Sequence, residues 1–373
     1  MAIGCCARAD TKVTGEMGPV LSSGSLGISS NALSLPKVQL AVANYTPVPF
    51  TNGWLQFKGH LSHGWFSNTP EIKGAYLHQK ALYLRVGKKQ LGFYGGLTHS
   101  AQWGGTFSSG QAPSRLKDFM RIFVGASGNG ADPIYNQGPI DIANAVGNHI
   151  IIPDFGFTFQ QNNSTVKLYT QTIFDKGIGD SSNVNKRDRL DGLKILGRDR
   201  LVGVSWETNK SAVLRKVLLE GLFTKHQGGN IIYNGRDNYY NNGTYRMGWQ
   251  YNGRIIGTPL FLNSANAANY NFDLNPSVMG GWPVVSNRVV GLHLGATGNI
   301  TSALDYRLLA SYVQHYGNYD NDAFFTPAKK QSHFLLELPY RFNKFSLTAG
   351  VAGDVGNLST NLAGLLRAEW KLR

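Results

Sequence analysis

Residues 303–316 read ALDYRLLASYVQHY, and residues 332–342 read SHFLLELPYRF. In both stretches apolar side chains occupy every second position, while Asp305, Arg307 and Glu337 lie between them. Because successive side chains of a β-strand point to opposite faces, each stretch predicts a strand with one apolar and one charged face. The apolar sets are Leu304, Tyr306, Leu308, Ala310 and Tyr312, and Phe334, Leu336, Leu338, Tyr340 and Phe342.

A membrane-spanning strand can carry a charged face only where that face lines a wet lumen and the apolar face meets lipid. A soluble barrel has the opposite arrangement, and alternation alone does not say which face is inside. On the membrane interpretation we expect one outward and one inward group of side chains. The outward group is Leu304, Leu308, Phe334 and Leu338, and the inward group is Asp305, Arg307, Glu337 and Arg341.

The lengths of the connections favour the membrane interpretation. Predicted strands are paired across short turns: 75–86 with 90–98, 148–159 with 165–174, 199–206 with 212–223, 289–297 with 303–316, and 332–342 with 345–354. Between these pairs the connections are long: 99–147, 175–198, 224–288 and 317–331. Short periplasmic turns and long extracellular loops are typical of outer-membrane barrels. The predicted fold class is therefore all-β, a large antiparallel transmembrane β-barrel of the bacterial outer membrane.

Composition agrees with this fold class and leaves the partner open. Charged residues make up 16% of the chain, against roughly 25% in soluble domains. The mean hydropathy is −0.21, and no run of about 18 apolar residues predicts a transmembrane helix. The net charge of +14 suits a polyanion, such as nucleic acid, lipopolysaccharide phosphate or an acidic glycan. Alternatively, the basic residues line a lumen or lie at the membrane interface.

The N-terminal region does not look like the start of an exported barrel. Residues 1–17 show no alternation, contain the adjacent Cys5 and Cys6, and lack the apolar stretch of an export signal. With 20–30 and 53–61 included, the strand count is about thirteen, whereas single-chain bacterial barrels have even counts. We therefore expect a ragged or non-native segment 1–17, and a barrel domain 18–373 that lacks its first strands. An unpaired edge at 362–372 would follow.

Two stretches of the connection 99–147 have helical rather than strand character. Residues 114–123 begin with Ser114 and carry apolar side chains at helical spacing, and residues 141–146 form a weaker second case. We expect these elements to plug or cap the lumen. In the first stretch the side chains expected to pack against protein are Leu116, Phe119, Met120 and Phe123.

Motifs of known enzymes are absent from the sequence. It contains no P-loop, no HExxH and no GxSxG motif, and the Gly-rich residues 125–130 lack the lysine of a phosphate loop. His60 and His63 would point to opposite faces of a strand, which is poor geometry for one metal ion. Asp188 and Asp191 lie among basic residues and are best interpreted as a charge-balanced loop or lumen wall. We predict no catalytic residue, no metal and no cofactor.

Residues 226–261, HQGGNIIYNGRDNYYNNGTYRMGWQYNGRIIGTPLF, hold the densest aromatic cluster. Aromatic rings can stack on sugar faces, while Asn and Arg side chains make planar hydrogen bonds to hydroxyls and carboxylates. The alternative is an interfacial aromatic belt. Because the cluster lies in one long connection, we predict a glycan-binding surface on the rim opposite the short turns. Its residues are Tyr233, Arg236, Tyr239, Tyr240, Tyr245, Trp249 and Arg254.

Several motifs in order resemble the Wzi family of capsule-assembly outer-membrane proteins, in its Bacteroides-like branch. They are Gly53-Trp54, Phe57-Lys58-Gly59, Ser62-His63-Gly64-Trp65-Phe66, Ala75-Tyr76-Leu77-His78-Gln79-Lys80, Tyr83-Leu84-Arg85, Gly147-Asn148-His149, Asp191-Gly192-Leu193, Gly197 and the block HQGGN, GRDNYYNNG, GW, GR and IGTP within 226–259. The resemblance covers roughly residues 18–373. It rests on no catalytic motif, and no sugar-contacting residue is carried over from the family.

The resemblance implies a large outer-membrane barrel whose lumen is blocked by helical elements. It also implies a lectin-like, non-enzymatic role in attaching or assembling capsular polysaccharide at the cell surface. The partners expected are outer-membrane lipid, a capsular or other surface polysaccharide, including an acidic one, and a capsule export channel, with no nucleic acid. Two alternatives remain: a porin or glycan export channel, which needs an open lumen, and an outer-membrane enzyme acting on lipid or glycan.

Overall fold

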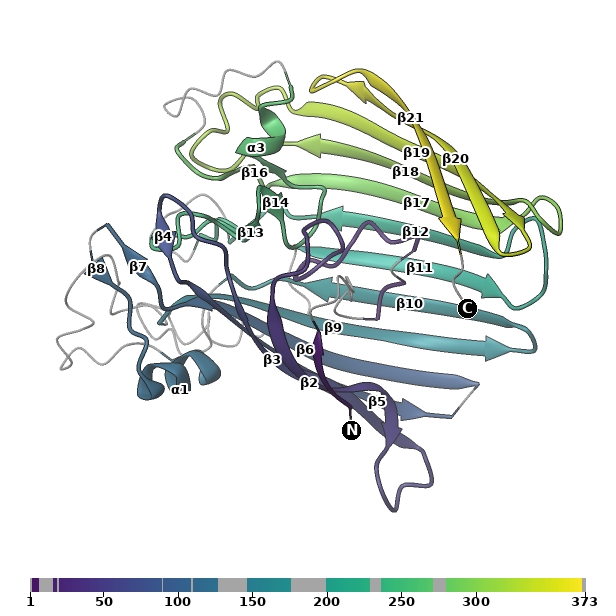
Figure 1. Cartoon of the computed structure of the whole chain (residues 1–373), viewed down its shortest axis with the longest axis horizontal. Coiled ribbons are helices and arrows are strands. Elements are labelled where there is room, and N and C mark those ends of the chain that lie inside the picture. The colour runs from purple at the N-terminus through teal and green to yellow at the C-terminus, as the bar shows by residue number, and fades with distance from the viewer. Residues whose placement is uncertain are drawn as a thin grey trace.

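The computed structural model describes residues 2–6, 16–18, 20–88, 90–108, 110–126, 146–175, 199–228, 236–270 and 280–370. Most of these residues belong to one 14-stranded sheet in which all neighbouring strands are antiparallel (Figure 1). Its strands, in spatial order, are β1 (Ala2–Cys6), β2 (Lys37–Pro47), β3 (Leu55–Trp65), β5 (Tyr76–Gly87), β6 (Leu91–Trp103), β9 (Asn148–Gln161), β10 (Ser164–Thr172), β11 (Arg200–Thr208), β12 (Lys216–Phe223), β17 (Val289–Asn299), β18 (Asp305–His315), β19 (Lys329–Phe342), β20 (Phe345–Gly356) and β21 (Asn361–Trp370).

The turns after β5, β9, β11, β17 and β19 lie at one end of the sheet, as predicted, and the turn after β2 lies there too. The short connection 357–360, between β20 and β21, lies at the opposite end. Asn162 and Asn343, in the turns after β9 and β19, have φ angles of 52° and 27°. Asparagine tolerates this left-handed region better than most residues, which suits it to tight hairpin turns. Gly87 closes the end of β5 by donating its N–H to the carbonyl of Trp54, 2.9 Å away in the turn after β2. This end is therefore a trimmed rim.

The long connections build the opposite rim, and all the remaining elements lie there (Figure 1). They are β4 (Ile72–Lys73), β7 (Thr106–Phe107), β8 (Gly110–Gln111), α1 (Leu116–Val124), β13 (Gln250–Tyr251), β14 (Arg254–Ile255), β15 (Leu262–Asn263), α3 (Ser264–Ala267) and β16 (Val284–Ser286). β4, β7 and β8 form a small sheet, and β13–β14 and β15–β16 are two-stranded ribbons. None of the helices that the structure describes is long and apolar enough to cross a membrane.

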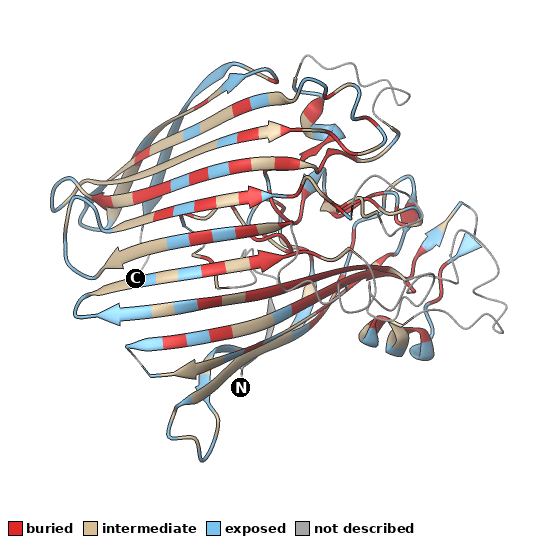
Figure 2. Ribbon diagram, turned by 180° about the vertical axis from the view of Figure 1, so that it is seen from behind, coloured by how far each residue is buried: buried red, intermediate tan, exposed pale blue. Residues whose placement is uncertain are grey.

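The two faces of the large sheet differ as the alternation predicts. Exposed and less exposed residues alternate along the central strands (Figure 2). The outward side chains are apolar: Phe93, Phe157, Leu168, Leu219, Leu292 and Phe334 are all exposed. On the inward face, Glu337 is only 6% exposed and accepts a hydrogen bond of 2.6 Å from Arg307. The expected orientation of Arg307 and Glu337 is confirmed, and lipid against the outer face explains the exposed apolar band.

The two ends of the sheet do not meet in the described part of the chain. β21 pairs with β20 alone, and every residue of β21 from Asn361 to Trp370 is exposed. β1 pairs with β2 alone. The unpaired edge predicted at 362–372 is thus confirmed for 362–370, which are its described residues, whereas residues 2–6, expected to be ragged, form a paired strand. The expectation that earlier strands are missing stays a prediction.

The strand predicted at 20–30 is wrong. Residues 20–36, all of them described, contain no strand, and Leu21 and Leu26 are fully buried against the inward face of the sheet. The Ser- and Gly-rich backbone of this segment is hydrogen-bonded by side chains of the wall rather than by a neighbouring strand. The sheet therefore reaches 14 strands without it, against the predicted count of about thirteen.

Replacing Leu294 with Arg should destabilise the protein in a lipid bilayer. Leu294 is the sixth of the 11 residues of β17, and its outward side chain is 39% exposed. A lipid-facing arginine near the bilayer midplane costs about 2–4 kcal/mol. Denaturant unfolding in vesicles, followed by tryptophan fluorescence, measures this loss.

Leu91→Arg is the matched control for depth. Leu91 also faces outward but begins β6 at the trimmed rim, where an arginine costs about 0–1 kcal/mol because its head reaches water. Equal losses for the two variants would show that no depth-dependent lipid environment surrounds this face.

Candidate functional site

Residues 16–36, here called the plug segment, cross the inward face of the sheet. Their backbone polar groups are buried and must find partners there. The inward side chains of β12, β17 and β18 supply them: the Glu220 carboxylate accepts from the Ser23 N–H at 2.7 Å, His293 Nε2 lies 2.7 Å from the Leu21 carbonyl oxygen, and Arg307 Nε donates to the Val20 carbonyl at 2.8 Å. Side chains of three neighbouring strands therefore hold the segment.

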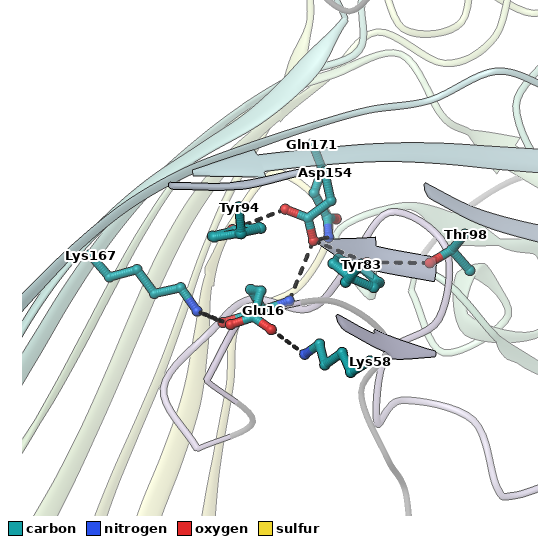
Figure 3. Close-up of polar contacts among 8 residues, drawn as sticks. All are labelled: Glu16, Lys58, Tyr83, Tyr94, Thr98, Asp154, Lys167 and Gln171. Carbon is teal, nitrogen blue, oxygen red and sulfur yellow. Dashed lines mark hydrogen bonds and ion pairs between the residues drawn. The ribbon is translucent and has the colours of Figure 1, made fainter. Parts of the chain in front are cut away.

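Glu16 anchors the start of the plug segment between two lysines (Figure 3). Its carboxylate forms ion pairs with Lys58 of β3 and with Lys167 of β10, the latter at 2.8 Å. The lysine side chains are 19% and 18% exposed, and that of Glu16 is 16% exposed. Burial by itself raises the pKa of the Glu16 carboxyl, but Lys167 and Lys58 outweigh it and hold the pKa below its ordinary value of 4.5.

Asp154 of β9 is the second anchor and lies directly beyond Glu16 (Figure 3). The buried carboxyl group accepts hydrogen bonds from Tyr94 at 3.1 Å and Gln171 at 3.0 Å, with Tyr83 at 3.3 Å. The Glu16 N–H approaches the same group at 3.4 Å. Donors from several strands therefore replace the water that this buried group has lost.

Gln171 and Glu220 continue this row of wall contacts. The Gln171 side-chain oxygen accepts hydrogen bonds from the Ser25 hydroxyl at 3.0 Å and from the Leu26 N–H at 3.1 Å. Glu220 also accepts a hydrogen bond of 2.7 Å from the Ser22 hydroxyl. Each small side chain of the Ser-Gly stretch lets the backbone approach the wall closely enough for these bonds.

Residues 236–263, here called the cap, close over the plug segment at the elaborated rim. The Trp249 indole N–H donates to the Gly27 carbonyl at 2.8 Å, and the Tyr240 hydroxyl donates to the Leu26 carbonyl. The Ser29 hydroxyl donates to the Gly257 carbonyl at 2.5 Å. Plug segment, cap and inward wall share one hydrophobic core. The inward face of the central strands, from β5 to β18, is therefore covered by protein.

Four of the aromatic residues predicted to form an exposed glycan-binding surface are buried, so the predicted exposure of these residues is wrong. The structure buries Tyr239, Tyr240, Tyr245 and Trp249 to 3% exposure or less, so these rings cannot face a sugar at the rim. Each polar tip has found a protein partner instead, as buried tyrosine and tryptophan require. The Tyr239 hydroxyl donates to Asp199 at 2.9 Å, and the Tyr245 hydroxyl to the Gly104 carbonyl at 3.2 Å.

The remaining predicted residues have different places. Arg254 is exposed, and Arg236 forms an ion pair of 2.8 Å with Asp320; glycan contact by either stays a prediction. Tyr233 lies outside the described residues, as do Asp188, Asp191 and residues 141–145 of the second helical stretch, whereas Val146 is described and buried. Burial raises the pKa of Tyr239, Tyr240 and Tyr245, so these phenols remain neutral hydrogen-bond donors.

The predicted helix at 114–123 exists as α1, but it does not plug the lumen. Phe119 packs against Trp103, with ring centroids 5.4 Å apart, and against His78 at 5.3 Å. These residues belong to the outward face of β5 and β6. Leu116 and Met120, expected to pack against protein, are 78% and 54% exposed. The hydrophobic pattern correctly predicted the helix, but not the side of the wall on which it lies.

A cluster of aromatic and charged side chains lies partly exposed at the elaborated rim. We call it the rim cluster: Arg236, Arg246, Trp282, Arg288, Tyr319 and Asp320. The Trp282 indole N–H donates to Asp320 at 2.6 Å, and the Arg288 guanidinium lies 3.8 Å from the centre of the Tyr319 ring. Sequence reasoning missed it because its members come from two connections that are far apart in the sequence.

Metal binding has no support in the described part of the chain, where no group of three or more potential ligands lies together. His60 and His63 point to opposite faces of β3, as predicted. His60 shares the inward face with Ser62, whose hydroxyl bonds to Gln79, whereas His63 packs against Trp103 on the outward face.

A large antiparallel sheet with a polar inward face, an apolar outward face and length-sorted connections defines the class of transmembrane β-barrels. Residues 17–266 match the family model of the capsule assembly protein Wzi, and the chain belongs to this family. No curated protein sequence matches the chain.

Of three similar solved structures, one has a TM-score above 0.5 and supports the fold. Wzi of Escherichia coli, described as an outer membrane protein involved in group 1 capsule assembly and a carbohydrate-binding β-barrel, matches with a TM-score of 0.51 at 14% identity. The match covers 95% of this chain and 63% of that one, so the chain spans less than two thirds of its length. BamA of Haemophilus ducreyi, solved without POTRA domains 1–3, matches with a TM-score of 0.33 at 8% identity, over 89% of this chain and 62% of that one. A Pseudomonas aeruginosa FadL homologue matches with a TM-score of 0.31 at 12% identity, over 93% of this chain and 81% of that one.

Acidification should release the start of the plug segment. Because the pKa of Glu16 is lowered in the folded protein, its ion pairs contribute fully above the ordinary value of 4.5 and are lost as pH falls through the lowered pKa. Glu16→Gln should reproduce that loss at neutral pH, by about 3 kcal/mol, because two lysines lose their buried partner. Amide hydrogen exchange of residues 20–35, corrected for intrinsic rates, measures the protection lost on acidification and the protection lost in the Glu16→Gln variant.

Glu369→Gln, at an exposed carboxylate of β21 that pairs with Arg367, is the control and should change nothing in the plug segment. Unchanged protection in Glu16→Gln at neutral pH would contradict the anchoring role.

Trp249→Ala should destabilise the cap instead of removing a surface contact. Trp249 is fully buried and bonded to the plug segment, so truncation leaves a cavity and an unpaired carbonyl, at a cost of about 3–5 kcal/mol. Trp54→Ala, at a side chain 53% exposed on the trimmed rim, should stay within about 0.5 kcal/mol. Equal unfolding midpoints for the two variants would show that the cap does not depend on this ring.

Proposed function

We propose that this protein is a non-catalytic, polysaccharide-binding barrel of the bacterial outer membrane that helps to attach or assemble a capsule at the cell surface. Its family is described as capsule assembly proteins. The similar Escherichia coli barrel is described as carbohydrate-binding. Both descriptions agree with a protein whose elaborated rim is the rim expected to face the cell exterior.

The rim cluster is the observation that carries the proposal. Trp282 and Tyr319 are partly exposed and fixed in place, so little conformational entropy is lost when a sugar ring stacks on them. Asp320 holds both Trp282, at 2.6 Å, and Arg236, at 2.8 Å, which orients an aromatic face beside a guanidinium. This pairing suits a glycan with hydroxyl groups to stack and carboxylates to bind.

Positive charge around the cluster favours an acidic polysaccharide. Arg246 is exposed and lies 5.6 Å from the Trp282 ring centre, and Arg254 is exposed on the neighbouring ribbon. Individual sugar contacts are weak, so retention would come from many repeats of one chain binding to many copies of the protein. Binding that includes arginine–carboxylate pairs weakens with salt.

The plug segment argues against the porin or export-channel alternative. A channel needs a continuous wet path, whereas Leu21 and Leu26 are buried between the inward wall and the cap. The enzyme alternative would need carboxyl groups that are free to exchange protons with a substrate. The buried carboxyl groups of Asp154 and Glu220 instead bond to the plug segment and the wall.

Replacing Trp282 or Tyr319 with Ala should reduce capsule retention while the barrel remains folded. Loss of one stacking ring from a multivalent surface should lower the apparent affinity for purified capsular polysaccharide by about tenfold, as about 1.4 kcal/mol implies. Glycan-array or biolayer binding of the full chain, together with capsule staining of complemented cells, measures the effect.

Trp54→Ala is the matched control, because Trp54 is an exposed ring on the opposite rim. Wild-type retention by correctly inserted Trp282→Ala and Tyr319→Ala variants would reject the rim cluster as the binding surface. Loss of binding in Trp54→Ala to the same extent would show that the assay reports general damage.

A further inference from the structure

The outward face of β5, β6 and β9 carries a groove beneath α1. The groove has a volume of about 450 Å³, within the range of about 300–1,000 Å³ that ligand pockets occupy. Its side chains come from the outward positions of the three strands and are apolar except at one end. They are Leu82, Leu84, Leu97, Pro153 and Phe155, with Lys80 and His99 at the polar end.

The groove exists because the sheet lacks a side chain at Gly95. Gly95 is in register with Leu84 on one side and Phe155 on the other. A Cβ built at Gly95 would lie 3.2 Å from the Phe155 ring, so any side chain there would fill the hollow. One row nearer the elaborated rim, Leu82 and Leu97 form its walls.

The polar end of the groove lies where α1 rests on the barrel. The Lys80 ammonium donates to the Phe123 carbonyl at the end of α1 and lies 3.9 Å from the centre of the Phe123 ring. The exposed stripe of α1, with Leu116, Met120 and Val124 at intervals of four residues, points away from the wall. A helix with such a stripe beside Lys117 and Arg121 has the composition of one lying at a membrane surface.

We propose that the groove and α1 bind one lipid A molecule of the outer leaflet, with an acyl chain in the groove and a phosphate beside Lys80. Three observations favour this occupant. The groove is continuous with the exposed apolar band formed by Phe93 and Phe157, which faces the acyl chains. Its polar end, with Lys80 and His99, lies toward the elaborated rim, and hence toward the outer leaflet. The Lys80 ammonium has three donors, of which the Phe123 carbonyl takes one, so donors remain for a phosphate.

The lysine also has a physical reason to lie on a lipid-facing wall. A cationic side chain is costly near the bilayer midplane but costs little near the interface. With a carbonyl and a phosphate as partners, Lys80 marks the depth at which acyl chains give way to headgroups. α1 then lies at that same level, with its apolar stripe among the outermost parts of the acyl chains.

The test uses the full chain, delipidated in maltoside micelles and titrated with bisphosphorylated lipid A, with bound lipid counted by native mass spectrometry. Gly95→Leu should fill the groove and weaken binding by about tenfold or more. Lys80→Met should weaken binding to a similar extent by removing charge-assisted hydrogen bonds. Dephosphorylated lipid A should be sensitive to Gly95→Leu but not to Lys80→Met.

Two variants serve as controls. Ala310→Leu enlarges an outward residue of β18 far from the groove, and Lys344→Met removes a charge from a turn at the trimmed rim; both should bind as the parent does. Parent-like binding by Lys80→Met would overturn the proposal, even if Gly95→Leu did not fold. Equal losses in the controls, or phosphatidylglycerol binding as tightly as lipid A, would also overturn it.

Discussion

Carboxyl groups carried into a protein interior lose their hydration and must regain equivalent partners from the protein. On the inward wall of this barrel, Glu16, Asp154 and Glu220 meet that requirement together. Glu16 takes two lysines, Asp154 takes side-chain donors from β6 and β10, and Glu220 takes donors from the plug segment. Each set of partners joins the plug segment to the wall. The conformation of the plug segment therefore depends on the wall side chains, and the buried wall carboxyl groups depend on the plug segment.

This constraint explains why one protein uses similar aromatic residues in two ways. In the cap, the hydroxyl and indole groups of Tyr240 and Trp249 bond to the plug segment, and their rings fill the space above it. At the rim, Trp282 and Tyr319 have charged neighbours on their exposed sides. The chemistry of the residues is the same, and only the presence of the plug segment beneath the cap separates core from surface.

The sequence was sufficient for features that depend on local periodicity. Strands such as β18 and β19, the inward position of Arg307 and Glu337, and the sorting of connections by length all follow from alternation and turn composition. Features that depend on distant partners were missed. Residues 20–30 were wrongly predicted as a strand. The wall side chains that bond to their backbone lie far away in the sequence, so no local pattern indicates them. Trp249 was placed on the surface because an amphipathic ring suits either environment.

The separation between the plug segment and its partners along the chain has a consequence for assembly. Glu16 contacts Asp154 across 138 positions, and Val20 accepts a hydrogen bond from Arg307 across 287. Contacts between residues so far apart in the sequence form late, because closing the long loop between them costs conformational entropy. The plug segment precedes most strands of the wall in the sequence and is therefore among the last parts to dock. Until β18 is in place, the inward wall presents its polar row to water, and a nascent barrel passes through a hollow stage that the finished protein does not show.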